Sequence, residues 1–209
     1  MNTTHAQLIH SLRVSGTLNT PRIIEAFQAI DRKNFVSPLF HDEAYANHPL
    51  PIGGGQTISQ PETVAFMLEL LQPMKGQRIL DIGSGSGWTS ALLAHMTGDD
   101  GMVIARERIP ELVARSKSIL MQYHLNIDLD IAGTTLGAPE FAPFERILVS
   151  ASTDALPTTL IEQLQINGVL VIPIQDAIHK ITKTESGFND EVYPDYLFVP
   201  LITETERPQ

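Results

Sequence analysis

The spacing of apolar residues divides the chain into a helical beginning, an irregular segment and a regular alternation of strands and helices. Residues 20–33 place large apolar side chains on one helical face, with Thr20 in the capping position and Pro21 in the first turn. Residues 34–58 carry three prolines and three consecutive glycines, so we expect a long and mostly irregular loop. A loop of that length in a compact domain usually has a function.

From residue 59 onward, short apolar runs of strand length alternate with segments of helical period. Helices are predicted at 63–71, 88–96, 111–124 and 158–165, and strands at 78–82, 102–106, 127–131, 146–150, 168–174, 178–183 and 196–202. This alternation predicts an α/β fold with a parallel sheet covered by helices on both faces. The last two strands have no helix between them and predict an antiparallel hairpin.

Composition narrows the classes of function. The 209 residues suit one domain over 1–209, with residues 1–58 as helices and a covering loop and residues 59–209 as the α/β core. The net charge of −10 and the absence of a basic cluster argue against nucleic acid or a membrane surface as partner. The chain has no cysteine, its seven histidines lack ligand spacing, and we expect no metal, no export signal and a cytoplasmic location.

A glycine-rich loop follows the strand at 78–82 and leads into a helix. Gly83, Gly85 and Gly87 alternate with serines, a spacing that differs from the GxGxxG of dinucleotide-binding proteins. Glycines let a ligand approach the backbone, and the helix start adds free N–H groups. Asp81, two residues before the loop, can attract a sulfonium or ammonium group, so the loop predicts a cationic ligand without a pyrophosphate.

The next strand ends in Glu107, which comes 20 positions after Gly87. A carboxylate at this strand tip can accept hydrogen bonds from both ribose hydroxyls. The alternative is a solvated charge beside Arg106 and Arg108. In register with the glycine loop, Glu107 favours a nucleoside.

These residues resemble the first motif of the class I S-adenosylmethionine-dependent methyltransferases. The stretch "LPIGGGQTISQPETVAFMLELL" is also similar to the signature of the protein-L-isoaspartate O-methyltransferase family, and "PRIIEAFQAIDRKNFV", "LDIGSGSGW", "LPTTLIEQL" and "LVIPI" resemble it in the same order. The resemblance covers residues 20–201. It implies a three-layer Rossmann-like methyltransferase fold with a mostly parallel seven-stranded sheet, a C-terminal antiparallel hairpin and an N-terminal helical extension.

The resemblance implies an enzyme that methylates the α-carboxylate of L-isoaspartyl residues in damaged proteins and starts their repair through a succinimide. The cofactor would be S-adenosylmethionine, with S-adenosylhomocysteine as product, and we expect a monomer. Ser59 is the catalytic residue that the family's pattern implies. The cofactor-binding residues predicted with it are Gln56, Thr57, Ile58, Asp81, Gly83, Ser84, Gly85, Gly87, Glu107, Gly133 and Thr134.

Ser59 also has a simpler interpretation. "SQPE" reads as a capping box of Ser59 and Glu62 ahead of an apolar helix. The two roles are compatible, because a carboxylate can bind the free N–H groups of a helix start. The single tryptophan, Trp88, is expected to pack a helix against the sheet, with cofactor contact as the alternative.

Several positions depart from the family pattern. Thr134 stands where an aspartate reaches the adenine, and loses a charge-assisted acceptor. Glu145 replaces an aspartate, Asn47 replaces an acidic residue, and Arg106 occupies a site that is usually apolar, where it could pair with Glu107. Alternative functions are therefore a methyltransferase for a normal aspartate in a specific peptide and a cofactor-binding relative without catalysis. A small-molecule or tRNA methyltransferase is disfavoured by the acidity and by "GQTISQP".

Overall fold

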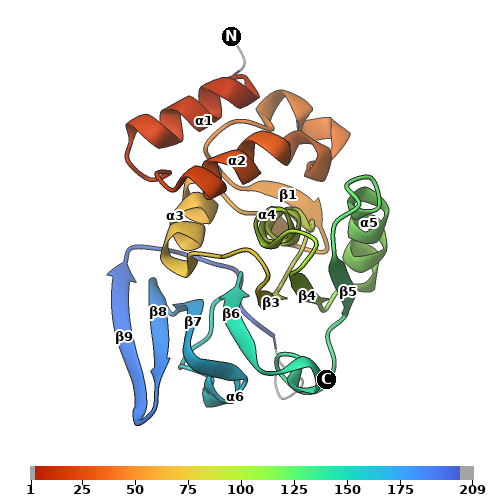
Figure 1. The fold of residues 1–209 in the computed structure, drawn as a ribbon. Helices are drawn as coiled ribbons and strands as arrows, with labels where there is room; N and C mark the ends of the chain where they lie inside the picture. The colour runs from red at the N-terminus through yellow and green to blue at the C-terminus, as the bar shows by residue number, and fades with distance from the viewer. Residues whose placement is uncertain (1–2, 203–209) are drawn as a thin grey trace.

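A computed structural model describes residues 3–202 and contains a seven-stranded sheet at its centre (Figure 1). The strands are β3 (Arg78–Ile82), β4 (Met102–Glu107), β5 (Ile127–Ile131), β6 (Phe144–Val149), β7 (Leu164–Ile174), β8 (Ala177–Thr184) and β9 (Gly187–Pro194). Their order is β5-β4-β3-β6-β7-β8-β9, and β3 to β7 are parallel. β8 and β9 are each antiparallel to the preceding strand, which confirms the predicted sheet and its C-terminal hairpin.

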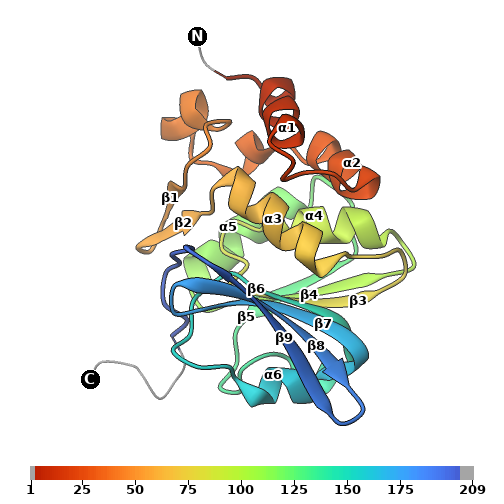
Figure 2. The same cartoon turned by 90° about the vertical axis from the view of Figure 1, so that its left-hand side faces the viewer.

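Helices cover both faces of the sheet, but unequally (Figure 2). One face carries α3 (Pro61–Leu71), α4 (Trp88–Thr97) and α5 (Pro110–Leu120), while α6 (Thr158–Glu162) lies on the other. Two hydrophobic cores follow from this arrangement. The larger core includes side chains of α3, α4 and α5, and the smaller one includes Leu160 of α6 and Ala138 of the loop that follows β5.

The N-terminal part forms an outer layer on the helical face. α1 (His5–Val14) and α2 (Pro21–Ala29) are followed by 3-10 turns at Arg32–Phe35 and Pro38–Glu43. The predicted helix at 20–33 thus ends early, at Ala29. Thr20 does not cap it, because its hydroxyl donates to Glu69 instead.

The segment 34–58 is less irregular than predicted. Its end forms an antiparallel hairpin of β1 (Leu50–Gly53) and β2 (Gln56–Ile58), with a turn through Gly54 and Gly55. All three glycines at 53–55 have positive φ, which other residues rarely adopt. The glycines therefore build a turn in this hairpin.

Two predictions in the C-terminal part are wrong. The last strand is β9 at Gly187–Pro194, whereas 196–202 contributes no strand to the sheet. α6 ends at Glu162, and its expected last turn already belongs to β7. Within residues 3–202, no helix is both long and apolar enough to cross a membrane.

Candidate active site

A pocket opens at the carboxyl ends of β3, β4 and β5, where ligands of open parallel sheets bind. The glycine loop, the end of β4, the loop after β5 and the hairpin strand β2 line it. Ten of the twelve residues predicted from the sequence lie in its wall: Gln56, Thr57, Ile58, Ser59, Gly83, Ser84, Gly85, Glu107, Gly133 and Thr134. The two outside it are Asp81 and Gly87.

The glycine loop has the conformation that its sequence predicts. Gly83, Gly85 and Gly87 all have positive φ. A Cβ on Gly85 would lie 3.2 Å from the side chain of Ile52, and one on Gly87 would lie 3.2 Å from Ser116 of α5. Gly87 thus serves the packing of α5 against the loop, which explains why it does not line the pocket.

Glu107 ties β4 to the glycine loop. One carboxylate oxygen accepts the Gly85 N–H at 3.0 Å, and the other accepts the Ile109 N–H at 2.9 Å. The side chain is only 6% exposed, yet it lines the pocket. Each oxygen keeps a lone pair, so the carboxylate can accept from a ligand hydroxyl while it orders the loop.

Asp81 lies beneath the glycine loop and is fully buried. Its Oδ2 accepts the hydroxyls of Thr89 at 2.9 Å and Ser90 at 2.6 Å, both on α4. Burial raises the pKa of Asp81 to about 6; the two hydroxyls act against this rise, and the negative charge of Glu107 adds to it. Asp81 therefore joins β3 to α4, and its carboxylate supports the loop from below.

Ser59 lines the pocket but does not cap α3. The N-cap is Gln60, whose side chain makes no capping bond, and Pro61 has no N–H to offer. Asn47 takes over the cap from a distant part of the chain: its Oδ1 accepts the Glu62 N–H at 3.0 Å, and its Nδ2 donates to Glu62 Oε2 at 2.8 Å. The capping-box prediction for Ser59 is wrong, and among residues 3–202 no hydrogen bond of its hydroxyl is seen.

A buried guanidinium lies behind Ser59. Arg32 is fully buried and donates to the carbonyls of Ala44 at 2.7 Å, His48 at 3.1 Å and Ser59 at 3.1 Å. It also lies 5.6 Å from the ring centroid of Trp88. Burial lowers the pKa of Arg32 to about 10, so it stays charged at neutral pH. This role cannot be predicted from the local pattern, which places Arg32 near the end of the predicted helix 20–33.

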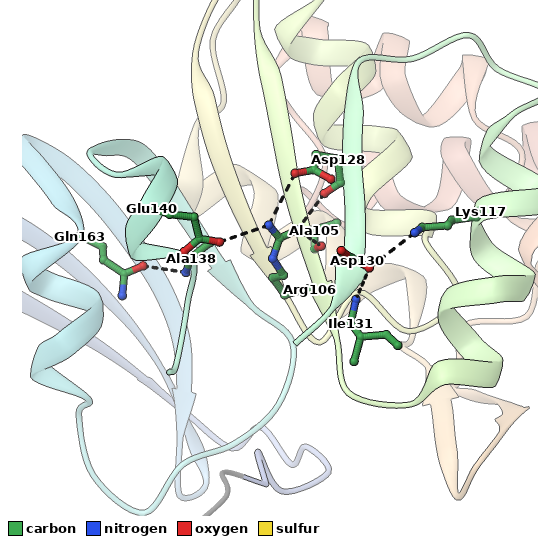
Figure 3. Close-up of polar contacts among 9 residues, drawn as sticks. All are labelled: Ala105, Arg106, Lys117, Asp128, Asp130, Ile131, Ala138, Glu140 and Gln163. Atoms are coloured by element: carbon green, nitrogen blue, oxygen red, sulfur yellow. Dashed lines mark hydrogen bonds and ion pairs between the residues drawn. The ribbon is translucent and has the colours of Figure 1, made fainter. Parts of the chain in front are cut away.

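Arg106 points away from Glu107. Its guanidinium reaches Asp128 at 3.5 Å and Glu140 at 3.6 Å (Figure 3). It also lies over the ring of Phe141. The expected pairing of Arg106 with Glu107 therefore does not arise in this geometry. Successive residues of a strand face opposite sides, which separates the two side chains.

The other departures also have local partners. Glu145 accepts the backbone N–H of Arg78 at the start of β3, at 2.9 Å, far from the glycine loop in the strand. Thr134 is exposed in the pocket wall and offers its hydroxyl there. Asn47 is accounted for by its bonds to Glu62, because a carboxylate in its place would face the Glu62 carboxylate.

One part of the pocket wall has no counterpart among the site residues predicted from the sequence. Residues 199–202 line it, held by Ser152, which accepts from the Leu201 N–H at 2.7 Å and donates to the Val199 carbonyl at 2.8 Å. Trp88, for which cofactor contact was the alternative, lines the pocket as well, and its ring packs edge-on against Phe27 of α2. The apolar run at 196–202 predicts a strand, but in the structure none of these residues is fully buried, and Leu197 is 89% exposed.

Comparison with known proteins gives the same family along the whole length. Residues 2–206 match the family described as protein-L-isoaspartate(D-aspartate) O-methyltransferase. A protein-L-isoaspartate O-methyltransferase of Ignicoccus hospitalis is 35% identical over 95% of this chain and 97% of its own, and one of Methanopyrus kandleri is 39% identical over 95% and 91%.

A solved structure agrees. A Plasmodium falciparum protein assigned to the protein-L-isoaspartate O-methyltransferases, crystallised with S-adenosyl-L-homocysteine, superposes with a TM-score of 0.85 and 26% identity, covering 96% of this chain and 99% of its own. With the matched length and these relatives, the chain belongs to the protein-L-isoaspartate(D-aspartate) O-methyltransferase family.

Proposed function

We propose that this protein transfers a methyl group from S-adenosylmethionine to the α-carboxylate of L-isoaspartyl residues, and that it does so in the pocket between the glycine loop and Ser59. Membership of the family supports the reaction. The observation that carries the location is the meeting of Ser59, the glycine loop and Glu107 in one pocket, although they come from three separate parts of the chain.

The residues present fit the cofactor. Glu107 offers free lone pairs to the ribose hydroxyls, and Gly83 and Gly85 leave the backbone accessible. Ser84 has a buried Oγ that lacks a hydrogen-bond partner among the described residues, so a polar ligand atom can form that hydrogen bond. Gly133 and Thr134 line the same wall next to Glu107, where the base would lie, with Gln56, Thr57 and Ile58 contributing from the hairpin.

The methyl transfer requires that the substrate carboxylate be positioned, and it does not require a general base. The bound cofactor supplies a methyl group already activated on a sulfonium, and its transfer leaves a methyl ester and S-adenosylhomocysteine. A carboxylate has an ordinary pKa near 4 and is ionised at neutral pH, so it attacks without losing a proton. The protein has to align the carboxylate and exclude water.

Ser59 is the residue that aligns the substrate. Its hydroxyl lies in the pocket wall and donates to one carboxylate oxygen, which leaves the other free to attack. Arg32 fixes the Ser59 backbone and places a positive charge behind it, which favours an anionic substrate. The role of the α3 start is smaller than the sequence predicted, because Pro61 has no N–H and Asn47 already binds that of Glu62.

Replacing Ser59 tests the assignment. A hydrogen bond to a charged group contributes roughly 1.5–3 kcal/mol, so Ser59→Ala is expected to lower kcat/KM for an isoaspartyl peptide by about 10- to 100-fold. The affinity for S-adenosylhomocysteine, measured by calorimetry, should stay unchanged. The control is Ser118→Ala on the exposed face of α5. A Ser59→Ala enzyme with the turnover of the control would remove Ser59 from the mechanism.

The choice of substrate is tested with two peptides that differ only in isoaspartate or aspartate at one position. Base-labile label from S-adenosylmethionine on the isoaspartyl peptide alone is the expected result. Label on the normal peptide would support the specific-aspartate alternative, and cofactor binding without transfer to either would support a relative without catalysis. The expected monomeric state and cytoplasmic location stay predictions, and light scattering on the purified protein tests the first.

A further inference from the structure

The loop of residues 132–138, here called the base loop, has little regular structure of its own. It contains no helix or strand, and its residues 132–135 are exposed. Residues 132–137 line the pocket. Its first residue is anchored to β4, because the Ala132 N–H donates to the Glu107 carbonyl at 2.9 Å. The far end has to be held by something else.

Gln163 holds that far end. Its Oε1 accepts the Ala138 N–H at 2.9 Å, and its Nε2 donates to the Leu136 carbonyl at 2.9 Å and the Thr159 carbonyl at 3.1 Å. The side chain is 5% exposed and lies outside the pocket wall. An amide is the side chain that offers an acceptor and two donors at one flat end. Neither a carboxylate nor an apolar group could replace all three bonds.

Gly137 allows the amide to come this close. A Cβ at Gly137 would lie 2.3 Å from Gln163 Oε1, and its φ of +92° is one that other residues rarely adopt. The amide therefore lies flat against the backbone of the base loop. The contact is specific to this pair of residues.

Arg106 fixes the turn that follows. Its guanidinium joins Glu140 and Phe141 of that turn to Asp128 of β5 and to the carbonyl of Ala105. Figure 3 shows Arg106 between Asp128 and Glu140, with Gln163 reaching Ala138 on the other side of the same loop. Since Arg106 precedes Glu107 in β4, the turn is tied to the strand that carries the ribose-binding carboxylate.

We propose that Gln163, assisted by Arg106, is a positioning residue that orders the base loop for recognition of the cofactor's adenine. Thr134 lacks the carboxylate that could hold the adenine by charge, so recognition depends on the backbone of this loop being in place. The inference rests on the proposed place of the cofactor in this pocket. The proposal predicts that loss of Gln163 weakens binding of the cofactor but not of the peptide, and that it weakens recognition of the adenine base in particular.

The experiment compares Gln163→Met with Gln165→Met. The same change is made at two positions of the chain, one buried under the base loop and one exposed two residues later. Calorimetry with S-adenosylhomocysteine is expected to give a Kd about 10-fold higher for Gln163→Met than for the control. The KM for S-adenosylmethionine should rise similarly, while the peptide KM and kcat at saturating cofactor stay within about 2-fold.

A second probe reports on the base. S-inosylhomocysteine differs from S-adenosylhomocysteine only at the 6-position of the purine, and the ratio of their Kd values is expected to move toward one in Gln163→Met. Loss of thermal stability with unchanged Kd values and an unchanged ratio would mean that Gln163 is merely structural, and would overturn the proposal.

The exposed Glu140→Gln supplies a milder variant that keeps the buried side chains, with an expected 2- to 3-fold rise in the Kd of S-adenosylhomocysteine. The Kd of the wild-type protein separates the two proposals. If the wild type binds S-adenosylhomocysteine but Gln163→Met and Glu140→Gln bind it equally well, only the positioning role is overturned. If the wild type does not bind it, the proposed function is overturned first.

Discussion

The two loops that line the cofactor side of the pocket are ordered in different ways. The glycine loop, residues 83–87, is shaped by its own glycines and by Glu107, which follows in the next strand. The base loop, residues 132–138, is held at its far end by Gln163, about 25 positions later in the chain. The glycine loop is ordered mainly by residues of its own motif, whereas the base loop is ordered by a side chain at the C-terminal end of α6.

The difference shows which features of a binding loop a sequence motif can predict. A spacing such as GxGxG records the residues that the ligand approaches, and here it also identified the carboxylate that orders them. A loop that is fixed by remote side chains has no such spacing. Its sequence "GTT" indicates only the loss of a charge-assisted acceptor for the adenine. Three variants test how far this contrast holds.

The largest effect is expected at Glu107, which orders the glycine loop and is proposed to bind the ribose. Glu107→Gln keeps the shape but turns one acceptor into a donor that faces a backbone N–H. The loss of one charge-assisted bond and the unpaired donor together cost about 4 kcal/mol, so the Kd of S-adenosylhomocysteine should rise roughly 1000-fold. Exposed Glu111→Gln is the control. A variant that binds like this control would show that Glu107 is not a ligand.

Asp81 makes stability depend on pH. Its carboxyl has a pKa of about 6 in the folded protein against an ordinary value of 3.8, mainly because it is buried. Between these values the folded state holds more protons than the unfolded state, so stability falls as pH rises through about 4 to 6. The full loss for a shift of about two units is roughly 3 kcal/mol.

Asp81→Asn should remove this fall. In urea titrations without cofactor, the free energy of unfolding of the variant relative to wild type is expected to rise from pH 4 to pH 7. Exposed Asp99→Asn gives the baseline. If the difference in free energy of unfolding between Asp81→Asn and wild type is constant from pH 4 to pH 7, the raised pKa of Asp81 is contradicted.

The smallest of the three effects concerns the base loop and uses two of its glycines. Gly137→Ala puts a side chain where φ is positive and where Gln163 lies, and should lower the free energy of unfolding by about 2 kcal/mol. Gly133→Ala has open space around the new Cβ and should change it by less than about 1 kcal/mol. Equal losses in urea titrations would show that the amide does not clamp this loop.

The sequence predicted the parts of the fold that depend on local apolar patterns. β3, β4, β6 and β7 were found because each contains a buried apolar run, while β5 and β8 alternate apolar with polar residues. β9 was missed because it is polar and exposed along most of its length and is defined by its pairing with β8. α1 did carry a signal, a capping box of Thr4 and Gln7 ahead of Leu8, Ile9 and Leu12, which the prediction did not use.

The residues of the candidate site also fall into two groups: those in local motifs, which could be predicted, and those with distant contacts, which could not. Ser59, Glu107, Gly83 and Gly85 lie in motifs, and they line the pocket. Asn47, Arg32 and Gln163 act through backbone groups that are distant in sequence, and such contacts have no period or spacing. The cap of α3 was assigned to Ser59 for this reason: the local capping-box pattern was visible, whereas the remote Asn47 was not.

The pocket wall runs from Gln56 in the hairpin to residues 199–202, which are fastened to Ser152. During synthesis the ribosome releases the glycine loop and Glu107 long before these last segments. The early strands of the sheet can therefore assemble while the pocket still lacks the wall formed by residues 199–202. Cofactor binding should then begin late in translation, once the chain through Ile202 has emerged.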